Sequence, residues 1–594
     1  MRILLILKTP VFIVLIMLPS IVNASVKIID NGVPQGVILI TPNAPDSVQF
    51  AADELQQHLY KMTGAQIDIR IEVNNDNKNA PVIISLGETE FALKHGVSSK
   101  GLPPDGFRIR EAGGAMVITG KDHKGLPLGD RRGRLKWTYN KRLKINAHGE
   151  TGTQFGVYRF LRDQGIRWYM PGEIGLIVPS KKNVVFNSES IEDAPQFTYR
   201  VLQGFSFDED PEAAIWYKRI GYGSIRYVNL NHSFTDWAKK FSNTHPEYFA
   251  KINGKYHFKI VHDKKRVSLN YTEPGVLDQV VTDAGKYFSK NKGEPLFAIV
   301  PNDSHHEHDE SPGTLRYITR EKYSPGWLSD LVWGFVNKAA AEVHERYPGK
   351  KVGSLAYTYQ FDAPTLIEKF SPNVVVMHCR RRSQFWDEDY KQYVQNNLLE
   401  FTKLGPSEQY IWEYYNLRSR DEKLQWVPFI MPRTIASDIY ALKGISSGEF
   451  IQAKQSKSSW KLVHPGLYHL NLYVTGRFLW NPDLNVEELL DEYYKLYYGE
   501  AAQPMSQFWN QLEKIWASQN KNLEMVKPIG PKERYLERKG LPKYYWKEVY
   551  SSEVVKELFK HLDNAKKMVE DNAVYNERVS FIYAEFEPMV KMAR

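Results

Sequence analysis

The chain has 594 residues, a formal net charge of +9, and 42% hydrophobic and 13% aromatic residues. This length is too great for one ordinary hydrophobic core, so two to four domains are expected. The hydrophobic and aromatic content excludes a disordered chain, and the single cysteine, Cys379, excludes an internal disulfide framework. The stability of the protein must therefore come from its cores.

Residues 1–24 have the pattern of a secretory signal peptide. A basic start with Arg2 and Lys8 precedes an apolar run that ends in small residues. Pro10 and Pro19 interrupt this run, which favours cleavage over the alternative, an N-terminal membrane anchor. No later stretch approaches the roughly 20 apolar residues that span a bilayer. We therefore expect an exported protein with no stable membrane insertion after cleavage.

Residues 121–144 hold nine Lys and Arg against Asp122 and Asp130, so the basic excess is local. An exported protein rarely meets nucleic acid, and we expect no such partner. The segment indicates either affinity for an acidic polysaccharide or another anionic surface, or a solvated hairpin.

Helix and strand patterns alternate from residue 25 to 192. Ala51, Leu55, Leu59 and Met62 lie on one face of a predicted helix, which Gly64 ends. Further predicted elements are buried strands at 81–88 and 115–120 and a helix at 153–165. This alternation predicts a compact α/β accessory domain.

Seven strand-like runs with helical patterns between them follow in residues 193–482. These runs are 199–204, 225–231, 296–303, 352–359, 373–379, 410–416 and 447–452. Strands separated by helices indicate a parallel sheet, and this number in roughly 280 residues predicts a (β/α)8-like TIM barrel. An open doubly wound sheet is the alternative. No Gly-rich phosphate loop follows the first strand, and we expect no cofactor.

Strand patterns stop near residue 483. Four helical patterns follow, at 485–499, 504–519, 552–571 and 576–594. They predict a helical C-terminal domain over residues 483–594.

Several blocks of the chain resemble known families. The blocks "ADELQQHLYKMTGA" (52–65), "DGFRIREAGGAMVITG" (105–120) and "FGVYRFLRDQGIRWYMPGEIGLIVP" (155–179) resemble the N-terminal accessory domain of α-glucuronidases and hexosaminidases. The blocks "NHSF" (231–234), "HPEYFAKINGK" (245–255), "VPNDS" (300–304), "SDLVWGFVN" (329–337), "LAYTY" (355–359), "SPNVVV" (371–376) and "FLWNPDLNVEELLDEYY" (478–494) look like the bacterial domain of unknown function 4838. The resemblance runs from about residue 30 to about residue 510.

This resemblance implies an accessory domain, a glycoside-hydrolase-like TIM barrel and a sugar-directed role. It brings neither a settled substrate nor an agreed catalytic pair. Two departures stand out. Relatives often follow the "PND" with a Cys-rich stretch, whereas this chain reads "SHHEHDESPG" (304–313), and residues 121–144 look like an insertion.

Hydrolysis of a glycosidic bond usually takes two carboxyl groups, which in a barrel project from the carboxyl ends of strands. Asp303, Glu413 and Glu449 meet that test. We take Asp303 and Glu413 as the working pair, with Asp303 favoured as the proton donor. Glu449 ranks third among these candidates, because its position in the alternation of the strand could point its side chain away from the barrel axis. A structural hydrogen-bonding role is the alternative for each.

Sugar recognition should come from other polar and aromatic groups near the strand ends. The candidates are His232, Asn302, Tyr357, Arg380, Trp412 and Tyr415. The planar fork of Arg380 suits a carboxylate or sulfate on the sugar. The aromatic rings beside Glu413 could stack on a sugar face and raise the pKa of that carboxyl. Ordinary packing or surface exposure is the alternative for each candidate.

The segment "IVPNDSHHEHDE" (299–310) holds three histidines among acids. His306 and His308 would share a face on a strand, and Asp303 or Asp309 could complete a zinc ligand set. The helical metalloprotease motif is absent, and loops of this composition bind stray metal weakly. We expect no functional metal and interpret the segment around His305 as the rim of a pocket.

The leading functional hypothesis is an exported glycoside hydrolase, with a uronic-acid-containing or otherwise anionic glycan as the expected substrate. A non-catalytic carbohydrate-binding protein on a hydrolase-like scaffold is the alternative, because fold does not fix function. A polysaccharide lyase that uses Tyr and His is a third hypothesis. The sequence gives neither the glycan and its linkage nor the oligomeric state.

Overall fold

The computed structural model describes residues 25–73, 81–124, 135–187, 190–261, 264–302, 308–322, 324–415, 422–453, 461–519 and 542–594. The predicted signal peptide and the middle of the basic segment 121–144 lie outside these residues. Within the described part, no helix is both long and apolar enough to cross a membrane.

The N-terminal part is built around a six-stranded sheet with the order β13-β6-β7-β5-β3-β4. Its elements, with the small strands that flank the sheet, are β1 (Ser25–Asp30), β2 (Val33–Pro34), β3 (Val37–Ile40), α1 (Asp46–Thr63), β4 (Ile69–Ile71), β5 (Val82–Leu86), α2 (Glu90–Lys94), β6 (Phe107–Ala112), β7 (Ala115–Gly120), α3 (Leu135–Thr138), β8 (Tyr139–Asn140), β9 (Ile145–Asn146), α4 (Gly152–Asp163), β10 (Arg167–Trp168), β11 (Leu176–Ile177), β12 (Val184–Asn187) and β13 (Ile191–Asp193). Helix α4 packs on β6 and β7, and α1 packs on α4 and β3. The predicted helices and strands of this region are confirmed.

Helix α1 illustrates why the local pattern is reliable here. Ala51, Leu55, Leu59 and Met62 are all buried in the core. Gly64 ends the helix in the left-handed conformation, at φ 75°, which glycine adopts without steric strain.

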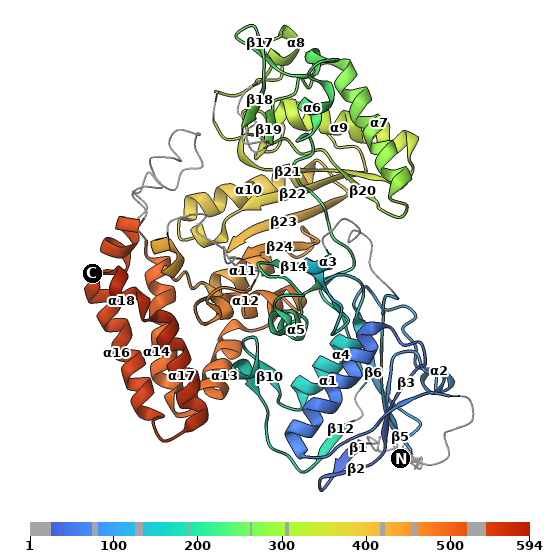
Figure 1. Ribbon diagram of the computed structural model, residues 1–594, viewed down its shortest axis with the longest axis vertical. Helices are drawn as coiled ribbons and strands as arrows, with labels where there is room; N and C mark the ends of the chain where they lie inside the picture. Colours follow the sequence, from blue (N-terminus) through green and yellow to red (C-terminus); the bar gives the residue numbers. More distant parts are fainter. Residues whose placement is uncertain are drawn as a thin grey trace, which may run out of the picture.

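The central part is a seven-stranded sheet with the order β15-β14-β24-β23-β22-β21-β20 (Figure 1). Its strands are β14 (Tyr199–Gln203), β15 (Gly223–Ser224), β20 (Leu296–Ala298), β21 (Lys351–Ala356), β22 (Val374–Arg380), β23 (Glu408–Tyr415) and β24 (Gly448–Ala453). All neighbours run parallel except β15, and β14 pairs with β24, the last strand in the chain. This curved sheet, with helices between its strands, is the predicted TIM-barrel-like architecture.

The helices of the central part connect and cover these strands. They are α5 (Pro211–Arg219), α6 (Trp237–Phe241), α7 (Pro274–Lys290), α8 (Pro312–Leu315), α9 (Ser329–Arg346), α10 (Glu388–Lys403), α11 (Pro432–Ala441) and α12 (Pro465–Trp480). The small strands β16 (Lys251–Ile252), β17 (Lys255–Tyr256), β18 (Phe258–Val261) and β19 (Lys264–Val267) form two hairpins near α6 (Figure 1).

One predicted strand, residues 225–231, is not a strand. Val228 and Leu230 are buried in the inner cluster of the barrel, as a strand would place them. The backbone N–H of Leu230 donates to the carbonyl of Val228, however, so the segment bonds within itself and forms no regular ladder. Ser233, just after this segment, donates hydrogen bonds to the carbonyls of Val300 and Ala298 at the end of β20. The apolar pattern predicted burial correctly but not the hydrogen bonding.

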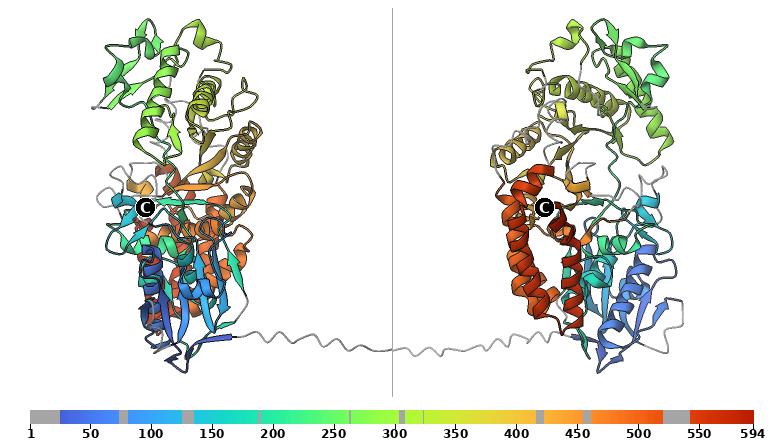
Figure 2. Two further views of the ribbon diagram at one scale, coloured as in Figure 1. Left: turned by 90° about the vertical axis from the view of Figure 1, so that its right-hand side faces the viewer. Right: turned by 60° about the vertical axis from the view of Figure 1, so that its left-hand side comes forward.

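The C-terminal part is helical, as predicted, with α13 (Val486–Tyr498), α14 (Ala502–Ala517), α16 (Ser552–Met568), α17 (Ala573–Phe586) and α18 (Pro588–Met592). These helices lie beside the N-terminal part as well as the barrel (Figures 1 and 2). A single hydrophobic cluster joins the accessory sheet, the outer faces of β23 and β24, and the terminal helices. The expected domain limits near 193 and 483 therefore mark changes of secondary structure within one continuous core.

Candidate functional site

The side chains of β22 and β23 alternate between the two faces of the sheet. The inner cluster contains Val375, Met377, Cys379, Tyr410 and Tyr414, with Trp412 packed against it. Glu413 therefore points to the opposite, outer face. Glu449 on β24 shares that face, because it pairs in register with Ile411, two residues before Glu413. Both carboxyl side chains are 0% exposed.

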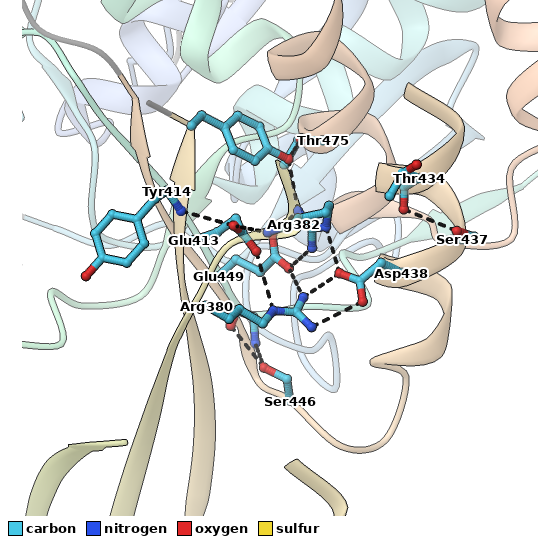
Figure 3. Close-up of polar contacts among 12 residues, drawn as sticks. Arg380, Arg382, Glu413, Tyr414, Thr434, Ser437, Asp438, Ser446, Glu449 and Thr475 are labelled. Carbon is cyan, nitrogen blue, oxygen red and sulfur yellow. Dashed lines mark hydrogen bonds and ion pairs between the residues drawn. The ribbon is translucent and has the colours of Figure 1, made fainter. Parts of the chain in front are cut away.

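Glu413 and Glu449 join a buried ion cluster between the sheet and α11 (Figure 3). Its members are Arg380, Arg382, Glu413, Asp438 and Glu449. Asp438 accepts bonds from Arg380 Nη1 at 3.1 Å and Arg382 Nε at 2.6 Å. Arg382 Nη2 pairs with Glu449, and its backbone N–H donates to Glu413 Oε1 at 2.7 Å. Two guanidinium groups thus face three carboxyl groups.

The two ends of this cluster differ in their protonation. Burial raises the pKa of Glu413 to about 7, although Arg382 and Arg380 act in the opposite direction. Burial also raises the pKa of Asp438, but there Arg380 and Arg382 outweigh it and hold the pKa below its ordinary value. Arg380 Nε lies 3.4 Å from Glu413 Oε2, and neither atom makes a hydrogen bond to any residue that the structure describes. Of these two carboxyl groups, Glu413 is therefore the one that takes up a proton as the pH falls through about 7, whereas Asp438 stays charged.

This arrangement corrects four expectations about the site. Glu413 and Glu449 do not face a saccharide cleft, because they are sealed between the sheet and α11 and bonded to arginines. Arg380 is 2% exposed and occupied by Asp438, so it is not placed to bind a sugar carboxylate. Tyr415 is buried on the same face, where its hydroxyl accepts from the guanidinium that also holds Glu449. These residues connect the outer face of the sheet to α11 through buried ion pairs and hydrogen bonds.

Three other predicted residues gather at the carboxyl ends of β20 and β21. Ala298 pairs with Gly353, so Asn302 and Tyr357, each four residues further along, leave the sheet at the same edge. His232 joins them, with Nδ1 2.5 Å from the carbonyl oxygen of Pro301. The side-chain amide of Asn302 is buried, and neither its oxygen nor its nitrogen has a hydrogen-bond partner in the described part of the chain. Asp303, the next residue, lies outside the described residues, and its catalytic role stays a prediction.

A cavity of about 440 Å³ opens at the carboxyl ends of β14, β23 and β24. The barrel supplies Trp412 from β23, Phe450 and Gln452 from β24, and Gln203 from β14. The loop after β14 adds Phe205 and Phe207, and the accessory part adds Trp137 and His148. The volume lies within the range of small-molecule sites, and barrel enzymes carry their active sites at this end. We call this cavity the aromatic pocket.

Amide groups sit beside the rings of the aromatic pocket. Trp412 Nε1 donates to Gln452 Oε1 at 3.2 Å, and the Trp412 and Phe450 ring centroids are 4.6 Å apart. Gln203 pairs in register with Gln452, so both amides project from the same rim. Aromatic faces with a few fixed polar groups are the chemistry that binds a saccharide ring and its hydroxyls.

His148 contributes a hydrogen-bond acceptor from the accessory part. Ser224 Oγ donates its only proton to the carbonyl of Arg226 at 2.9 Å, so it must accept from His148 Nδ1, which lies 2.6 Å away. The unprotonated nitrogen is therefore Nε2, which is buried and has no hydrogen-bond partner within the described ranges. Burial lowers the pKa of His148 to about 3, and Lys218 lowers it further, so the ring is neutral.

None of the described residues that line the aromatic pocket carries a carboxylate. Polar and aromatic groups are therefore present there, and an acid acting at this pocket would have to come from another part of the chain. Of these lining residues, the sequence pattern singled out Trp412 as a candidate but not Gln203, Gln452 or His148. The alternation of side chains along the strands could have identified the two glutamines. Gln452 lies three residues after Glu449 and therefore on the opposite face of β24, and Gln203 pairs with it.

The described end of the His-rich segment has a structural role. Asp309 is 3% exposed and accepts from the backbone N–H groups of Lys251 and Ser311. His308 Nδ1 lies 2.8 Å from the carbonyl oxygen of Asp309. His305 and His306 lie outside the described residues, among which no group of three His, Cys, Asp or Glu is arranged as metal ligands.

We expect metal analysis of purified, chelator-treated protein to show no stoichiometric zinc while sugar binding persists. The reason is that both carboxylate oxygens of Asp309 already accept hydrogen bonds from backbone N–H groups. Zinc retained at one ion per chain would contradict this prediction.

The fold and the pocket define an α/β barrel protein with an accessory α/β part and a helical C-terminal part. The chain belongs to the family described as "Domain of unknown function (DUF4838)", whose model matches residues 170–510. Residues 29–129 match a second model, "Glycosyl hydrolase family 67 N-terminus". The expected family and its accessory domain are thus confirmed. No curated protein matches the chain.

Among solved structures, the chain is similar to a family GH115 4-O-methyl-α-glucuronidase with specificity for decorated arabinogalactans (TM-score 0.53, 11% identity, 95% of this chain and 72% of that one). It is also similar to a β-N-acetylhexosaminidase from Bacteroides fragilis (TM-score 0.39, 12% identity, 84% and 96%). A third is a family 89 glycoside hydrolase from Clostridium perfringens (TM-score 0.40, 10% identity, 92% and 65%). At these identities the comparison concerns the fold, and only the first score exceeds 0.5.

Proposed function

We propose that the protein is an exported glycoside hydrolase that binds a poly- or oligosaccharide in the aromatic pocket. The observation that carries this proposal is the pocket itself. Its rings and amides suit a sugar, and it lies where barrel enzymes act. The accessory part, through His148 and Trp137, completes the pocket wall, so it takes part in substrate binding.

Hydrolysis by two carboxyl groups requires acids that reach the pocket. Asp303 remains our proposed proton donor, because the chain leaves β20 at the rim where Asn302, His232 and Tyr357 gather. Glu413 and Glu449 are not part of this mechanism, since they are sealed on the outer face. The second acid is unassigned.

Export and an anionic substrate are parts of the same proposal that rest on sequence. Residues 1–24 support export, and the nine basic residues of 121–144 support attraction of an acidic glycan. Arg380 no longer supports an anionic substrate, because Asp438 and Glu449 occupy it.

A non-catalytic carbohydrate-binding protein is the second candidate. It is favoured by the lack of a carboxylate among the described residues of the aromatic pocket. Screening the full chain against a glycan panel for both affinity and product release separates the two. Affinity with product release supports the hydrolase, and affinity without any product supports the binding protein.

Replacing Trp412 by alanine should weaken binding of the best panel glycan about tenfold, or about 1.4 kcal/mol, because a stacking face is lost. Isothermal titration calorimetry measures the effect. Trp386→Ala is the matched control, since Trp386 is also a half-buried indole but does not line the pocket. Equal affinity in Trp412→Ala and wild type would place the sugar elsewhere.

A further inference from the structure

A second cavity, of about 400 Å³, lies between the accessory part and helices α12 and α13. Helix α4 and β10 form one wall, and the C-terminal half of α12 with the start of α13 forms the other. The backbone N–H groups of Gln196 and Phe197, just before β14, bond the end of α12 beside this cavity. It therefore lies at the amino end of β14, whereas the aromatic pocket lies at the carboxyl end.

Four arginines line this cavity, and two of them are neutralised by carboxylates. Arg159 pairs with Asp163 at 3.0 Å and with Asp193 at 3.7 Å. Arg167 forms a two-bond fork with Glu492, at 2.7 and 2.6 Å. These pairs account for three of the four carboxylates in the lining.

The other two arginines, Arg162 on α4 and Arg477 on α12, form no ion pair with a carboxylate among the described residues. The structure gives neither guanidinium a hydrogen bond or an ion pair among the described residues, and the Nε atom of Arg477 is buried without a partner. The remaining carboxylate, Glu488, is exposed at the edge of the cavity and accepts from Asn485. The wall thus presents unpaired positive charge from two different parts of the fold.

This arrangement is unfavourable when the cavity holds only water. Burial lowers the pKa of the Arg162 guanidinium and the charge of Arg477 lowers it further, and together they outweigh Asp163, which acts in the opposite direction. An arginine side chain nevertheless stays charged in proteins, so the repulsion persists in the folded state. Both arginines are partly buried, and an anion between their guanidinium groups would offset the repulsion by bidentate hydrogen bonds.

We propose that this cavity is a second ligand site, which binds an oxyanion between Arg162 and Arg477. The shared chemistry is a carboxylate, sulfate or phosphate group, either free or carried by a sugar. The volume accommodates a monosaccharide, and Trp480, Leu484 and Leu489 supply an apolar wall beside the charges. This site shares no lining residue with the aromatic pocket. Its ligand would bridge Arg162 of the accessory part and Arg477 of the barrel.

The test is thermal unfolding of the full chain in sodium sulfate and in sodium chloride at equal ionic strength. The variants are Arg162→Gln and Arg477→Gln. The matched control is Arg346→Gln, which removes an exposed arginine that pairs with Glu342 on α9. We expect a saturable rise of Tm with sulfate in wild type and in Arg346→Gln. Both cavity variants should lose this rise and show at least a tenfold weaker apparent affinity.

Two further arms sharpen the result. In chloride alone, Arg162→Gln should unfold at the same temperature as wild type or higher, because it removes one of two repelling charges. Repeating the measurement with sodium glucuronate separates the two sources of the anion. Tighter binding of glucuronate indicates a sugar-borne carboxylate, and tighter binding of sulfate indicates a free inorganic anion. An equal sulfate response in all variants would reflect the general effect of this salt on burial and would overturn the proposal.

Discussion

Replacing Asp438 by asparagine should lower the free energy of unfolding by about 3–5 kcal/mol at pH 8, the range for breaking a buried ion pair. Asp438 accepts from both Arg380 and Arg382 and is 2% exposed. Its pKa is held below the ordinary value, so its contribution is fully present at pH 8. The asparagine variant would leave two buried guanidinium groups with a neutral partner in place of a charged one.

Replacing Glu413 by glutamine at the same pH should leave the stability unchanged or raise it. The cluster holds two arginines and three carboxyl groups, so glutamine brings the opposite charges into balance. The Oε1 atom of glutamine can still accept from the backbone N–H of Arg382. Two carboxyl groups of one cluster are thus expected to respond in opposite ways: Asp438→Asn lowers the stability at pH 8, whereas Glu413→Gln does not.

The pH dependence gives the sign of the Glu413 contribution. Its pKa is about 7 in the folded protein and near 4.5 in an unfolded chain, so the folded state binds this proton more tightly. The stabilisation is therefore fully present below pH 4.5 and is lost as the pH rises through about 7. Wild type should gain stability relative to Glu413→Gln as the pH falls from 8 to 5.

Urea unfolding of wild type, Glu413→Gln and Asp438→Asn at pH 8 and pH 5 measures both effects. Equal destabilisation by the two substitutions at pH 8, with no difference in their pH dependence, would contradict the raised pKa of Glu413. A loss of sugar binding in folded Glu413→Gln would instead restore this carboxyl to the binding site.

Asp303→Asn should lower turnover of a panel substrate by about 10²–10⁴-fold while leaving its affinity largely intact. An amide cannot supply the proton that the leaving oxygen requires, and general acid catalysis contributes rate factors of this size. The binding groups of the aromatic pocket remain in this variant. Steady-state kinetics and calorimetry on the same preparation separate the two effects.

Asp278→Asn is the matched control for Asp303→Asn, because Asp278 is exposed on α7, away from the aromatic pocket. Full turnover in Asp303→Asn would remove this residue from the mechanism. Affinity without product in wild type would favour the binding protein over the hydrolase.

Local periodicity was enough to predict much of this fold. The helix at Ala51 and Leu55, six of the seven barrel strands and the C-terminal helices follow from apolar spacing, because burial of one face imposes that spacing on the sequence. The segment 225–231 differs, since its apolar residues are buried without a ladder. The pattern of apolar residues predicts which side chains are buried, whereas the formation of a strand also depends on a neighbouring strand that can bond to its backbone.

The sequence by itself determined the family, the order of strands and helices, and the presence of acids and aromatic rings near strand ends. It did not determine which face of β23 points inward, because a buried parallel strand carries apolar residues on both faces and only its partners distinguish them. Tertiary structure placed Trp412 in the pocket and Glu413 against α11. It also paired Asp438 with two arginines more than 50 positions away, and left Arg162 and Arg477 facing one cavity.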